Sequence, residues 1–394
     1  MTTPPTPIEA TGRGPSPEEL ALLTRLLDAG EVLLLPTETV YGLAARADVP
    51  DALRRLRELK GRPSDVPLSW HLGTRTALDT LAGLACHGMP LAPLVRRLAG
   101  DFWPGPVTLV VAVDLPPDHP ADVLVRDGLL GLRCPAHTFT GALLDAVPAP
   151  VVMSSANQHG SPPATNCGDA LGALASGQLG AAVDAGPTAS SQAELSSTVL
   201  VLAPGRFEVQ REGLLSLDDL RRSAGLRIGF ACTGNTCRSP MAEVLGLRAI
   251  AARLAGGQAP DAHADQRELL DRFGFGVTSM GLAAYPGSPA SGHSVESMAT
   301  RGLDLSGHSS QPADLELLAS LDAVYTMTRS HRDALIGGLR SADDGRFAEL
   351  AERVQLLDPE GGDISDPFGG DAGVYETSAR DIAAAIEARV VDWA

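Results

Sequence analysis

The sequence has almost no lysine, few cysteines and no long hydrophobic run. Its 394 residues include 31 basic side chains, of which only Lys60 is lysine and the other 30 are arginine. No stretch approaches the roughly 18 consecutive apolar residues that a membrane-spanning helix needs, so we expect no membrane association. Residues 1–17 have neither a basic region nor an apolar region, which predicts no secretory signal and a cytoplasmic location.

The cysteines argue against two common kinds of stabilising site. They form no paired CxxC motif and show no Cys/His spacing typical of zinc ligands, so the sequence predicts neither a disulfide framework nor a metal site. Any function for these residues must therefore come from individual thiols. The five cysteines are Cys86, Cys134, Cys167, Cys232 and Cys237.

The charge balance restricts the ligands that the protein can hold. The formal net charge is −17, with 48 acidic side chains. This argues against a broad nucleic-acid or anionic-membrane surface, because such binding draws on summed positive potential. An anionic ligand must therefore sit in a local pocket. One lysine retained among arginines favours a role for Lys60 that needs an ammonium group rather than a guanidinium group.

The length predicts two domains, since a single hydrophobic core stops growing at about 250 to 300 residues. We expect residues 1–15 to be a disordered tail and residues 16–213 to form a mixed α/β domain. The short, polar, Gly-terminated segment 214–225 predicts a linker. Residues 226–394 then alternate strand-like and helix-like segments, which predicts an α/β domain with a doubly wound parallel sheet.

A phosphate-binding loop is predicted between a strand and a helix in the second domain. Cys232 and Arg238 enclose five residues there. A loop of this length directs backbone N–H groups to one centre, the helix start faces the same point, and Arg238 clamps two oxygens. The positive surroundings favour the thiolate form of Cys232, a nucleophile. The other predicted loop residues are Thr233, Gly234, Asn235, Thr236, Cys237 and Ser239.

The segment CTGNTCRSPMAE closely resembles the signature of the low-molecular-weight protein tyrosine phosphatases, and the resemblance covers about residues 226–394. It implies a phosphorylated protein substrate and no cofactor, with Cys232, Arg238 and Asp366 as catalytic residues. Asp366, in the segment DPFGG, would protonate the leaving group and then act as base for water attacking the phosphocysteine. A simple turn residue is the alternative interpretation of Asp366.

Two loop residues leave alternatives open. Cys237 is either a core thiol or a redox partner that closes reversibly on Cys232, as the family's second loop cysteine suggests. Thr236, together with DPFGG, resembles the protein-arginine-phosphatase branch of the family. That branch favours threonine at this position, where many phosphotyrosine enzymes carry isoleucine. We therefore favour phosphoarginine over phosphotyrosine. The alternative for Thr236 is a hydroxyl that only satisfies loop backbone.

The first domain carries polar residues at the ends of its predicted strands. Together they supply cations, hydroxyls and an amide where α/β proteins usually bind ligands, and they suit a nucleotide with an amino-acid-sized second substrate. These residues are Thr37, Glu38, Thr39, Tyr41, Lys60, Arg62, His71, Arg133, Ser155, Asn157, Ser197 and Thr198.

Seven separated segments resemble the YrdC-like threonylcarbamoyl-adenylate synthases over about residues 18–213. The resemblance implies an α/β fold around a twisted sheet that converts L-threonine, bicarbonate and ATP, with Mg²⁺, into threonylcarbamoyl-AMP and pyrophosphate. This is the first step of making N6-threonylcarbamoyladenosine in transfer RNA, so the resemblance also implies tRNA-modification proteins as partners. The segments are PTETVYGL, LKGRPSDVPLSWHL, FWPGPVTLV, GLRCPAH, SSANQHGSPPAT, SSTV and the segment containing Arg211.

The same resemblance divides the polar residues between two substrates. A carbamate attacking the α-phosphorus brings two anions together, so cations such as Lys60 and Arg62 and Mg²⁺ would offset the repulsion. By position, threonine would be held by Thr37, His71, Arg133 and Ser197, and ATP by Lys60, Arg62, Ser155, Asn157 and Arg211.

Some positions depart from the family pattern. Val66, Leu129 and Pro163 stand where polar residues are usual, and His159-Gly160 replaces Ser-Gly. Each lost hydrogen bond is worth about 0.5 to 1.5 kcal/mol, so these changes predict weaker ATP binding. The alternative to the bifunctional enzyme is therefore a phosphotyrosine phosphatase with a non-catalytic nucleotide- or RNA-binding first domain.

Overall fold

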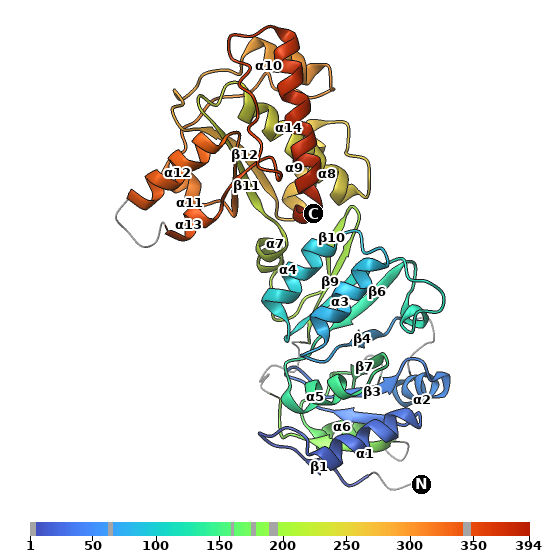
Figure 1. Cartoon of the computed structure of the whole chain (residues 1–394). Coiled ribbons are helices and arrows are strands. Elements are labelled where there is room, and N and C mark those ends of the chain that lie inside the picture. The colour runs from blue at the N-terminus through green and yellow to red at the C-terminus, as the bar shows by residue number, and fades with distance from the viewer. Residues whose placement is uncertain (1–4, 62–65, 159–160, 175–178, 189–195, 342–347) are drawn as a thin grey trace. The chain divides into compact units, whose positions relative to one another are not determined.

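The computed structural model describes residues 5–61, 66–158, 161–174, 179–188, 196–341 and 348–394. The chain divides into two compact units, Met1–Leu220 and Arg221–Ala394 (Figure 1). The boundary falls inside segment 214–225, where we expected a linker, and this segment contains helix α7 (Leu217–Ala224).

A mixed, ten-stranded sheet runs through the first unit in the order β1-β8-β2-β3-β7-β4-β6-β5-β9-β10. Parallel and antiparallel pairs occur side by side, as in the parallel pair β5–β9 and the antiparallel pair β9–β10. The strands are β1 (Ile8–Glu9), β2 (Val32–Leu35), β3 (Gly42–Arg46), β4 (Ser69–His71), β5 (Val107–Ala112), β6 (Leu129–Arg133), β7 (Val151–Ser155), β8 (Leu179–Asp184), β9 (Thr198–Ala203) and β10 (Arg206–Arg211).

The first helix begins as the sequence predicts. The Ser16 hydroxyl accepts a hydrogen bond from the Glu19 amide at 3.2 Å, and the Glu19 carboxylate accepts one from the Ser16 amide at 2.8 Å, which together form a capping box. Leu23 and Leu27 of this helix are fully buried against Phe139. The unit's helices are α1 (Pro17–Asp28), α2 (Pro50–Lys60), α3 (Ala77–Cys86), α4 (Ala92–Phe102), the short 3-10 helix η1 (Asp122–Leu124), α5 (Thr138–Ala146) and α6 (Cys167–Ala173).

The N-terminal segment differs from the expected disordered tail of residues 1–15. Strand β1 pairs in parallel with β8, and the Ala10 amide donates to the Asp184 carbonyl at 2.7 Å. Ala10 is buried. The strand is only two residues long, so its sequence carries no alternation that would reveal it, and pairing with the edge of the sheet is what orders it.

In the second unit, four parallel strands form a sheet in the order β12-β11-β13-β14. The strands are β11 (Arg227–Cys232), β12 (Gly276–Gly281), β13 (Ala323–Thr326) and β14 (Val354–Leu356). The helices are α8 (Arg238–Ala255), α9 (His263–Arg272), α10 (Gly292–Ala299), α11 (Leu315–Ala319), α12 (Arg329–Ser341), α13 (Ala348–Glu352) and α14 (Ala372–Trp393).

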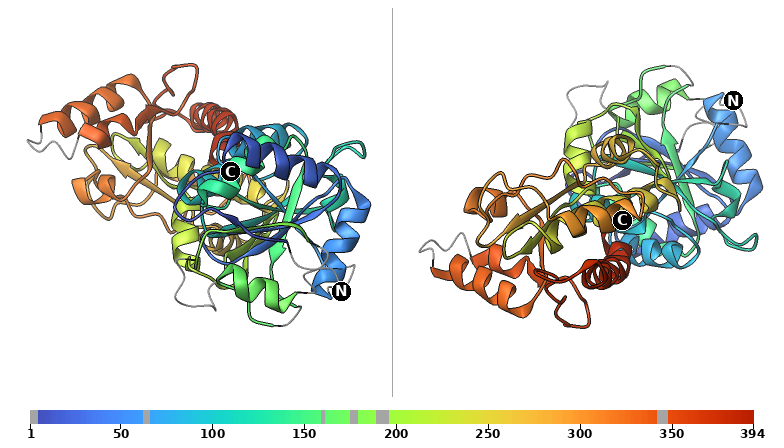
Figure 2. Two further views of the ribbon diagram at one scale, coloured as in Figure 1. Left: turned by 90° about the horizontal axis from the view of Figure 1, so that it is seen from below. Right: turned by 90° about the horizontal axis from the view of Figure 1, so that it is seen from above.

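Helices cover both faces of this parallel sheet. Phe230 and Ala231 are neighbours on β11 and therefore point to opposite faces. The Phe230 ring contacts Trp393 of α14, with ring centroids 6.2 Å apart, whereas Ala231 packs in a cluster with Leu335 of α12. Figures 1 and 2 show α8 and α14 on one side of these strands and α12 on the other. The predicted α/β class is thus confirmed for both parts of the chain.

Among the described residues, no helix is both long and apolar enough to cross a bilayer.

Candidate active sites

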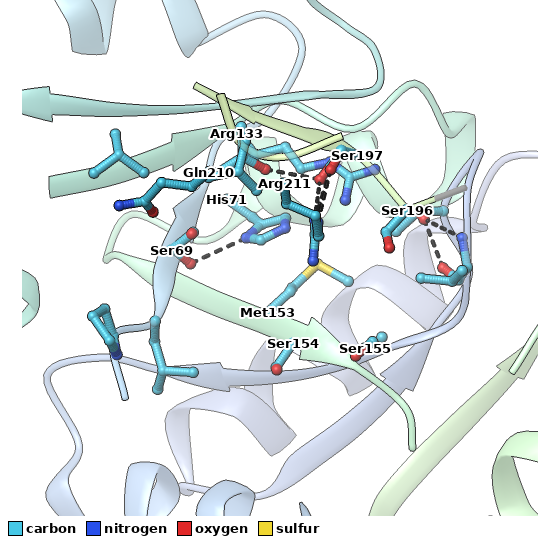
Figure 3. Close-up of a pocket in the computed structure, with 18 of the residues that line it drawn as sticks. Ser69, His71, Arg133, Met153, Ser154, Ser155, Ser196, Ser197, Gln210 and Arg211 are labelled. Carbon is cyan, nitrogen blue, oxygen red and sulfur yellow. Dashed lines mark hydrogen bonds between the residues drawn. The ribbon is translucent and has the colours of Figure 1, made fainter. Parts of the chain in front are cut away.

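Strand register brings the first site together. His71, Arg133, Thr108, Val199 and Arg211 are successive cross-strand partners on β4, β6, β5, β9 and β10. Side chains in one such row share a face of the sheet. Together with Thr37, Ser155 and Ser197 they line a cavity of about 350 Å³ (Figure 3).

Hydrogen bonds along one edge of its guanidinium hold the Arg133 side chain in place. Its Nη2 donates to Glu38 Oε1 at 2.7 Å and to Thr39 Oγ1 at 2.8 Å. The second Glu38 oxygen accepts from the Ala136 amide at 3.0 Å, so the carboxylate is itself held in place. Arg133 Nε is buried and has no hydrogen-bond partner among the described residues. Glu38, which our sequence analysis names only among the pooled polar residues, therefore positions Arg133.

Arg211 and Ser197 form the neighbouring part of the row. The Arg211 guanidinium donates to the Ser197 carbonyl through Nε at 3.0 Å and Nη2 at 2.7 Å, and Nη2 also reaches Ser197 Oγ at 2.9 Å. Ser197 Oγ lies 2.9 Å from Thr108 Oγ1. Partial burial, followed by the charge of Arg133, lowers the pKa of Arg211. Two cations on one wall of the cavity thus favour an anionic ligand.

His71 is a neutral group at the end of the row. Its Nδ1 lies 3.1 Å from the Ser69 carbonyl, an acceptor, so Nδ1 carries the proton in the neutral ring. Burial and then the charge of Arg133 lower the pKa of His71 to about 3. His71 therefore offers Nε2 as a hydrogen-bond acceptor.

Thr37 lines the same cavity but uses its hydroxyl within its own loop. Thr37 Oγ1 donates to the Val40 carbonyl at 2.6 Å and accepts from the Val40 amide at 3.1 Å. These bonds shape the turn after β2, so Thr37 offers a ligand a surface rather than a free hydroxyl.

The ammonium of Lys60, the last residue of α2, is enclosed by the end of β7. Its Nζ donates to the Ser155 carbonyl, to Asn157 Oδ1 at 3.1 Å and to the Asn157 carbonyl at 3.1 Å. Lys60 is only 2% exposed, and Ser155 lines the cavity. The structure thus brings together three of the five predicted ATP residues. Arg211 instead bonds Ser197, a predicted threonine residue, and Arg62 lies outside the described residues.

The three positions that depart from the family pattern lie in different places. Val66 lines the cavity. Leu129 and Pro163 are half-buried and are not among the residues that line it. His159-Gly160 lies outside the described residues. Of the described departures, only Val66 therefore bears directly on the cavity.

In the second unit, Cys232 is the last residue of β11 and Arg238 the first residue of α8, as predicted. Both side chains are buried. Cys232 Sγ lies 3.0 Å from Ser239 Oγ, and Ser239 Oγ donates to the Met280 carbonyl at 3.1 Å. A Ser239 hydroxyl that turns toward the sulfur would stabilise the thiolate.

Asn235 holds the loop in its shape. It has a φ of +54°, a left-handed conformation that asparagine tolerates. Its Nδ2 donates to Ser239 Oγ at 3.0 Å and to Ser279 Oγ at 2.9 Å. Its Oδ1 accepts from the Gln311 amide at 2.8 Å, and His308 Nε2 lies 2.7 Å from its carbonyl. The hydrogen bonds of Asn235 thus join the loop to neighbouring elements and fix its shape.

Gly281 allows the loop to lie against β12. A Cβ at this position would be 2.7 Å from the Thr233 carbonyl oxygen and 2.8 Å from the Asn235 nitrogen. Both contacts are too short for real atoms, so only glycine fits. Our sequence analysis missed Gly281, and no local signal marks it, because the contact joins segments far apart in the chain.

Arg238 meets Asp366 directly. Arg238 Nη2 donates to Asp366 Oδ2 at 2.7 Å, and Nη1 donates to the Ile364 carbonyl at 3.0 Å. The Asp366 side chain is 51% exposed, so it faces both the arginine and the solvent. The structure therefore places the predicted nucleophile loop and the predicted general acid at one site.

His331 of α12 is a further contact of the loop. Its Nε2 lies 2.9 Å from Thr233 Oγ1, and its buried Nδ1 has no partner among the described residues. Burial and then the charge of Arg238 lower the pKa of His331. Sequence reasoning did not identify His331, since nothing in its local segment indicates proximity to Cys232.

The second half of the loop packs against α10 and α14. The Ser291 amide donates to the Thr236 carbonyl at 2.8 Å. Cys237 Sγ lies 3.4 Å from the Tyr375 hydroxyl and 3.7 Å from Thr236 Oγ1, and both Cys237 and Tyr375 are buried. Gly234 lies between Thr233 and Asn235 in the first half. Within the part of the chain that the structure describes, no group of three acidic, His or Cys side chains is arranged to hold a metal.

Comparisons with known proteins agree with this division. A family model described as Telomere recombination, named for Sua5, YciO and YrdC, matches residues 25–213. A second model, described as low molecular weight phosphotyrosine protein phosphatase, matches residues 227–394.

For two relatives, the match with this chain covers most of the relative's length. The chain is 33% identical to a putative threonylcarbamoyl-AMP synthase of Mycobacterium tuberculosis (strain CDC 1551 / Oshkosh) over 205 residues. These residues are 51% of this chain and 86% of that protein. The chain is also 34% identical to the protein-arginine-phosphatase of Bacillus subtilis over 148 residues. These residues are 37% of this chain and 83% of that protein. The chain belongs to both families. Both resemblances that we inferred from the sequence are thereby confirmed.

A longer relative is the threonylcarbamoyl-AMP synthase of Bacillus subtilis, 34% identical over 209 residues, or 52% of this chain. The match covers 57% of that relative, so the chain spans just over half the length of the synthase.

Proposed function

We propose that the first unit is a threonylcarbamoyl-AMP synthase that consumes L-threonine, bicarbonate and ATP and releases pyrophosphate. The observation that carries the proposal is the single row of cross-strand partners on the cavity wall, which contains neutral His71, its neighbour Arg133 and, at the other end, Arg211. An amino acid carboxylate and a nucleotide phosphate are both anions, and this wall attracts both.

The contacts suggest how the substrates are divided. Thr37, His71, Arg133 and Ser197 would surround threonine, with Arg133 pairing its carboxylate. On the ATP side, Lys60 keeps Ser155 and Asn157 in place, and Arg211 draws an α-phosphate toward the threonine carbamate. The carbamate oxygen then attacks the α-phosphorus, and the bond to pyrophosphate breaks.

Magnesium fits this cavity only as a companion of ATP. The described lining residues include hydroxyls but no carboxylate. Mg²⁺ usually takes one or two carboxylates or substrate phosphates as ligands. The anionic ligands of Mg²⁺ would therefore come from ATP, where the ion would offset charge on the departing pyrophosphate.

A pyrophosphate assay tests this proposal. We expect wild-type protein to release pyrophosphate from ATP only when L-threonine and bicarbonate are both present. Lys60→Ala should lose this activity, whereas Arg54→Ala, an exposed change on the same helix, should keep it. A Lys60→Ala enzyme as active as wild type contradicts the assignment.

A nucleotide-binding module without catalysis is the second candidate for this unit. It is favoured by one observation, that Val66 lines the cavity where a polar residue is usual. Equilibrium binding of ATP without any turnover of threonine and bicarbonate would establish this candidate instead.

We propose that the second unit is a cysteine-dependent protein phosphatase. The Cys232 thiolate attacks phosphorus while Arg238 holds two phosphate oxygens, and Asp366 protonates the departing nitrogen or oxygen. Water then attacks the phosphocysteine, Asp366 takes the proton, and phosphate leaves. The 2.7 Å contact between Arg238 and Asp366 supports these proposed roles.

Phosphoarginine is the proposed substrate, and phosphotyrosine is the alternative. Thr236 and the similarity to a protein-arginine-phosphatase favour the guanidinium substrate. Phosphoarginine and phosphotyrosine peptides should be compared on wild type and Thr236→Ile. We expect wild type to prefer phosphoarginine and the variant to shift toward phosphotyrosine; an unchanged ratio removes Thr236 as the selector.

The arrangement of the whole chain is also a proposal. We infer two domains, a first that includes strand β1 and ends at residue 213 and a second over residues 226–394, joined by residues 214–225, because the division at Leu220 falls within that segment. We further propose a cytoplasmic location and tRNA-modification proteins as partners of the first domain. Co-purification with a tRNA-modifying acyltransferase tests the partner proposal.

A further inference from the structure

The edge strand β10 contains an irregularity at the cavity. Val209 pairs with Leu200 and Arg211 pairs with Val199, so Gln210 is an extra residue that faces no partner on β9. Such a bulge re-aims side chains and is common at sheet edges and next to active sites. In a regular strand Gln210 and Arg211 would point to opposite faces, yet both line the cavity.

Gln210 lies at the end of the cavity away from Ser155, one of the predicted ATP residues. Figure 3 shows Gln210 and Ser69 on one side and Ser155 and Ser196 on the other. Because Lys60 bonds Ser155, the positive charge that suits a polyphosphate lies near that second side. The Gln210 end is the part of the cavity left for the rest of a nucleotide.

The surroundings of Gln210 suit a flat aromatic group. Val66, Leu68 and Val110 are apolar and line the cavity with it. Gly131 of β6 is the cross-strand partner of both Ser69 and Val110, so β6 presents no side chain to the cavity at that point. Apolar walls with one convergent polar group are typical of small-molecule sites.

The side-chain amide of Gln210 is available to a ligand. The residue is exposed, and no hydrogen bond from its amide to any described residue is found. A glutamine amide presents one donor and one acceptor in a plane, which matches adenine N7 and the N6 amino group in a bidentate pair.

We propose that Gln210 recognises the adenine base of ATP, which would make it a specificity-determining residue of the synthase reaction. The inference rests on the proposed function of this unit. The bulge is the structural cause, because it turns the amide into the cavity beside Arg211. Hypoxanthine carries a carbonyl oxygen where adenine carries the N6 amine, so it meets the amide with a mismatched edge.

Binding of ATP and ITP to the full chain tests this inference, together with pyrophosphate release from each nucleotide. Wild type should bind ATP about tenfold more tightly than ITP, the scale of one bidentate contact. Gln210→Leu keeps the size of the side chain but removes both hydrogen bonds. It should bind ATP about tenfold more weakly and lose the preference over ITP. Glu208→Gln, an exposed change on the same strand, is the matched control and should keep the wild-type ratio.

The other outcomes overturn the inference. If Gln210→Leu keeps the wild-type ratio while wild type releases pyrophosphate, the function stands and the role of Gln210 does not. A change in the KM for L-threonine alone would place the amide beside the amino acid instead. If Glu208→Gln shifts the ratio equally, distortion of the strand is the cause. Wild type that neither binds ATP nor releases pyrophosphate removes both proposals together.

Discussion

Arg238 and Asp366, which are 128 residues apart in the chain, are joined by a 2.7 Å ion pair at the phosphate loop. The arginine side chain is 4% exposed and the aspartate side chain 51%. The proposed clamp is thus buried and the proposed acid is half-exposed, which suits a reaction in which phosphate enters the loop and the leaving group departs toward solvent.

Asp366→Asn should slow the phosphatase most when the leaving group needs a proton. General acid catalysis contributes about 10²- to 10⁴-fold, so we expect a loss of that order with phosphopeptides. The loss should be much smaller with p-nitrophenyl phosphate, whose leaving group is stable as an anion. Steady-state kcat/KM on both substrates, which reports only the steps up to departure of the leaving group, measures this, with Glu360→Gln as an exposed control. Equal losses on both substrates would indicate that Asp366 only orients Arg238.

Ser239→Ala should reduce the reactivity of Cys232. The Ser239 hydroxyl lies 3.0 Å from Cys232 Sγ, and a hydrogen bond to a charged group is worth about 1.5 to 3 kcal/mol. We therefore expect iodoacetamide to alkylate Cys232 about tenfold more slowly at pH 6. Mass spectrometry of the labelled peptide follows the rate. Ser320→Ala, on the surface, should leave it unchanged, and a wild-type rate in Ser239→Ala would contradict the proposed stabilisation.

Lys60→Arg should disrupt the first site although it keeps the charge. The Lys60 ammonium is 2% exposed and is enclosed by Ser155 and Asn157, so a planar guanidinium does not fit the same acceptors. Overpacking of this kind costs about 1 to 3 kcal/mol. We expect lower stability in urea titrations and loss of pyrophosphate release, whereas Arg54→Lys on the same helix should retain both. Full activity in Lys60→Arg would show that the site needs only a positive charge.

Acid should destabilise the first unit through His71. In the unfolded chain His71 binds a proton near pH 6.5, whereas in the folded chain its pKa is lowered to about 3. Between these values protonation favours unfolding. The stability due to the neutral ring is therefore complete above pH 6.5. It falls on acidification toward pH 3, by at most about 1.4 kcal/mol per pH unit.

Urea titrations between pH 7 and pH 4 measure this effect. A Trp393→Phe background leaves the fluorescence to Trp70 and Trp103 of the first unit. His71→Gln, which cannot titrate, should show a shallower pH dependence than His71. An identical slope in the two proteins would assign the acid sensitivity to other groups.

Much of the second site could be predicted because its central residues are adjacent in the chain. Cys232, Arg238 and the residues between them form one strand–loop–helix segment, so their chemistry can be inferred from the local sequence. The braces of this loop were not predicted: His331 and Gly281 come from other elements and touch the loop only in the folded chain. The approach of Asp366 was implied by the family resemblance and could not be derived from spacing.

In the first unit the limits of sequence reasoning were different. The resemblance grouped Lys60, Ser155 and Asn157 as ATP residues, and the structure joins these three by hydrogen bonds. It gave no role to Glu38, which orients Arg133, or to Gln210. The reason for Gln210 is physical: whether a residue in a strand faces the cavity depends on register, and a bulge changes register without a sequence signature.

The amino-acid sequence alone determined the two α/β families, the order of their segments, the residues proposed as nucleophile and clamp, and the lone lysine. These features depend on local motifs and on hydrophobic patterning, which are properties of short stretches of chain. Only the tertiary structure decided which side chains share a cavity, which cation is held by which carboxylate, and that strand β1 extends the sheet. Those relationships depend on strand register and on close approach between distant segments, and the free energy that fixes them is that of the folded chain as a whole.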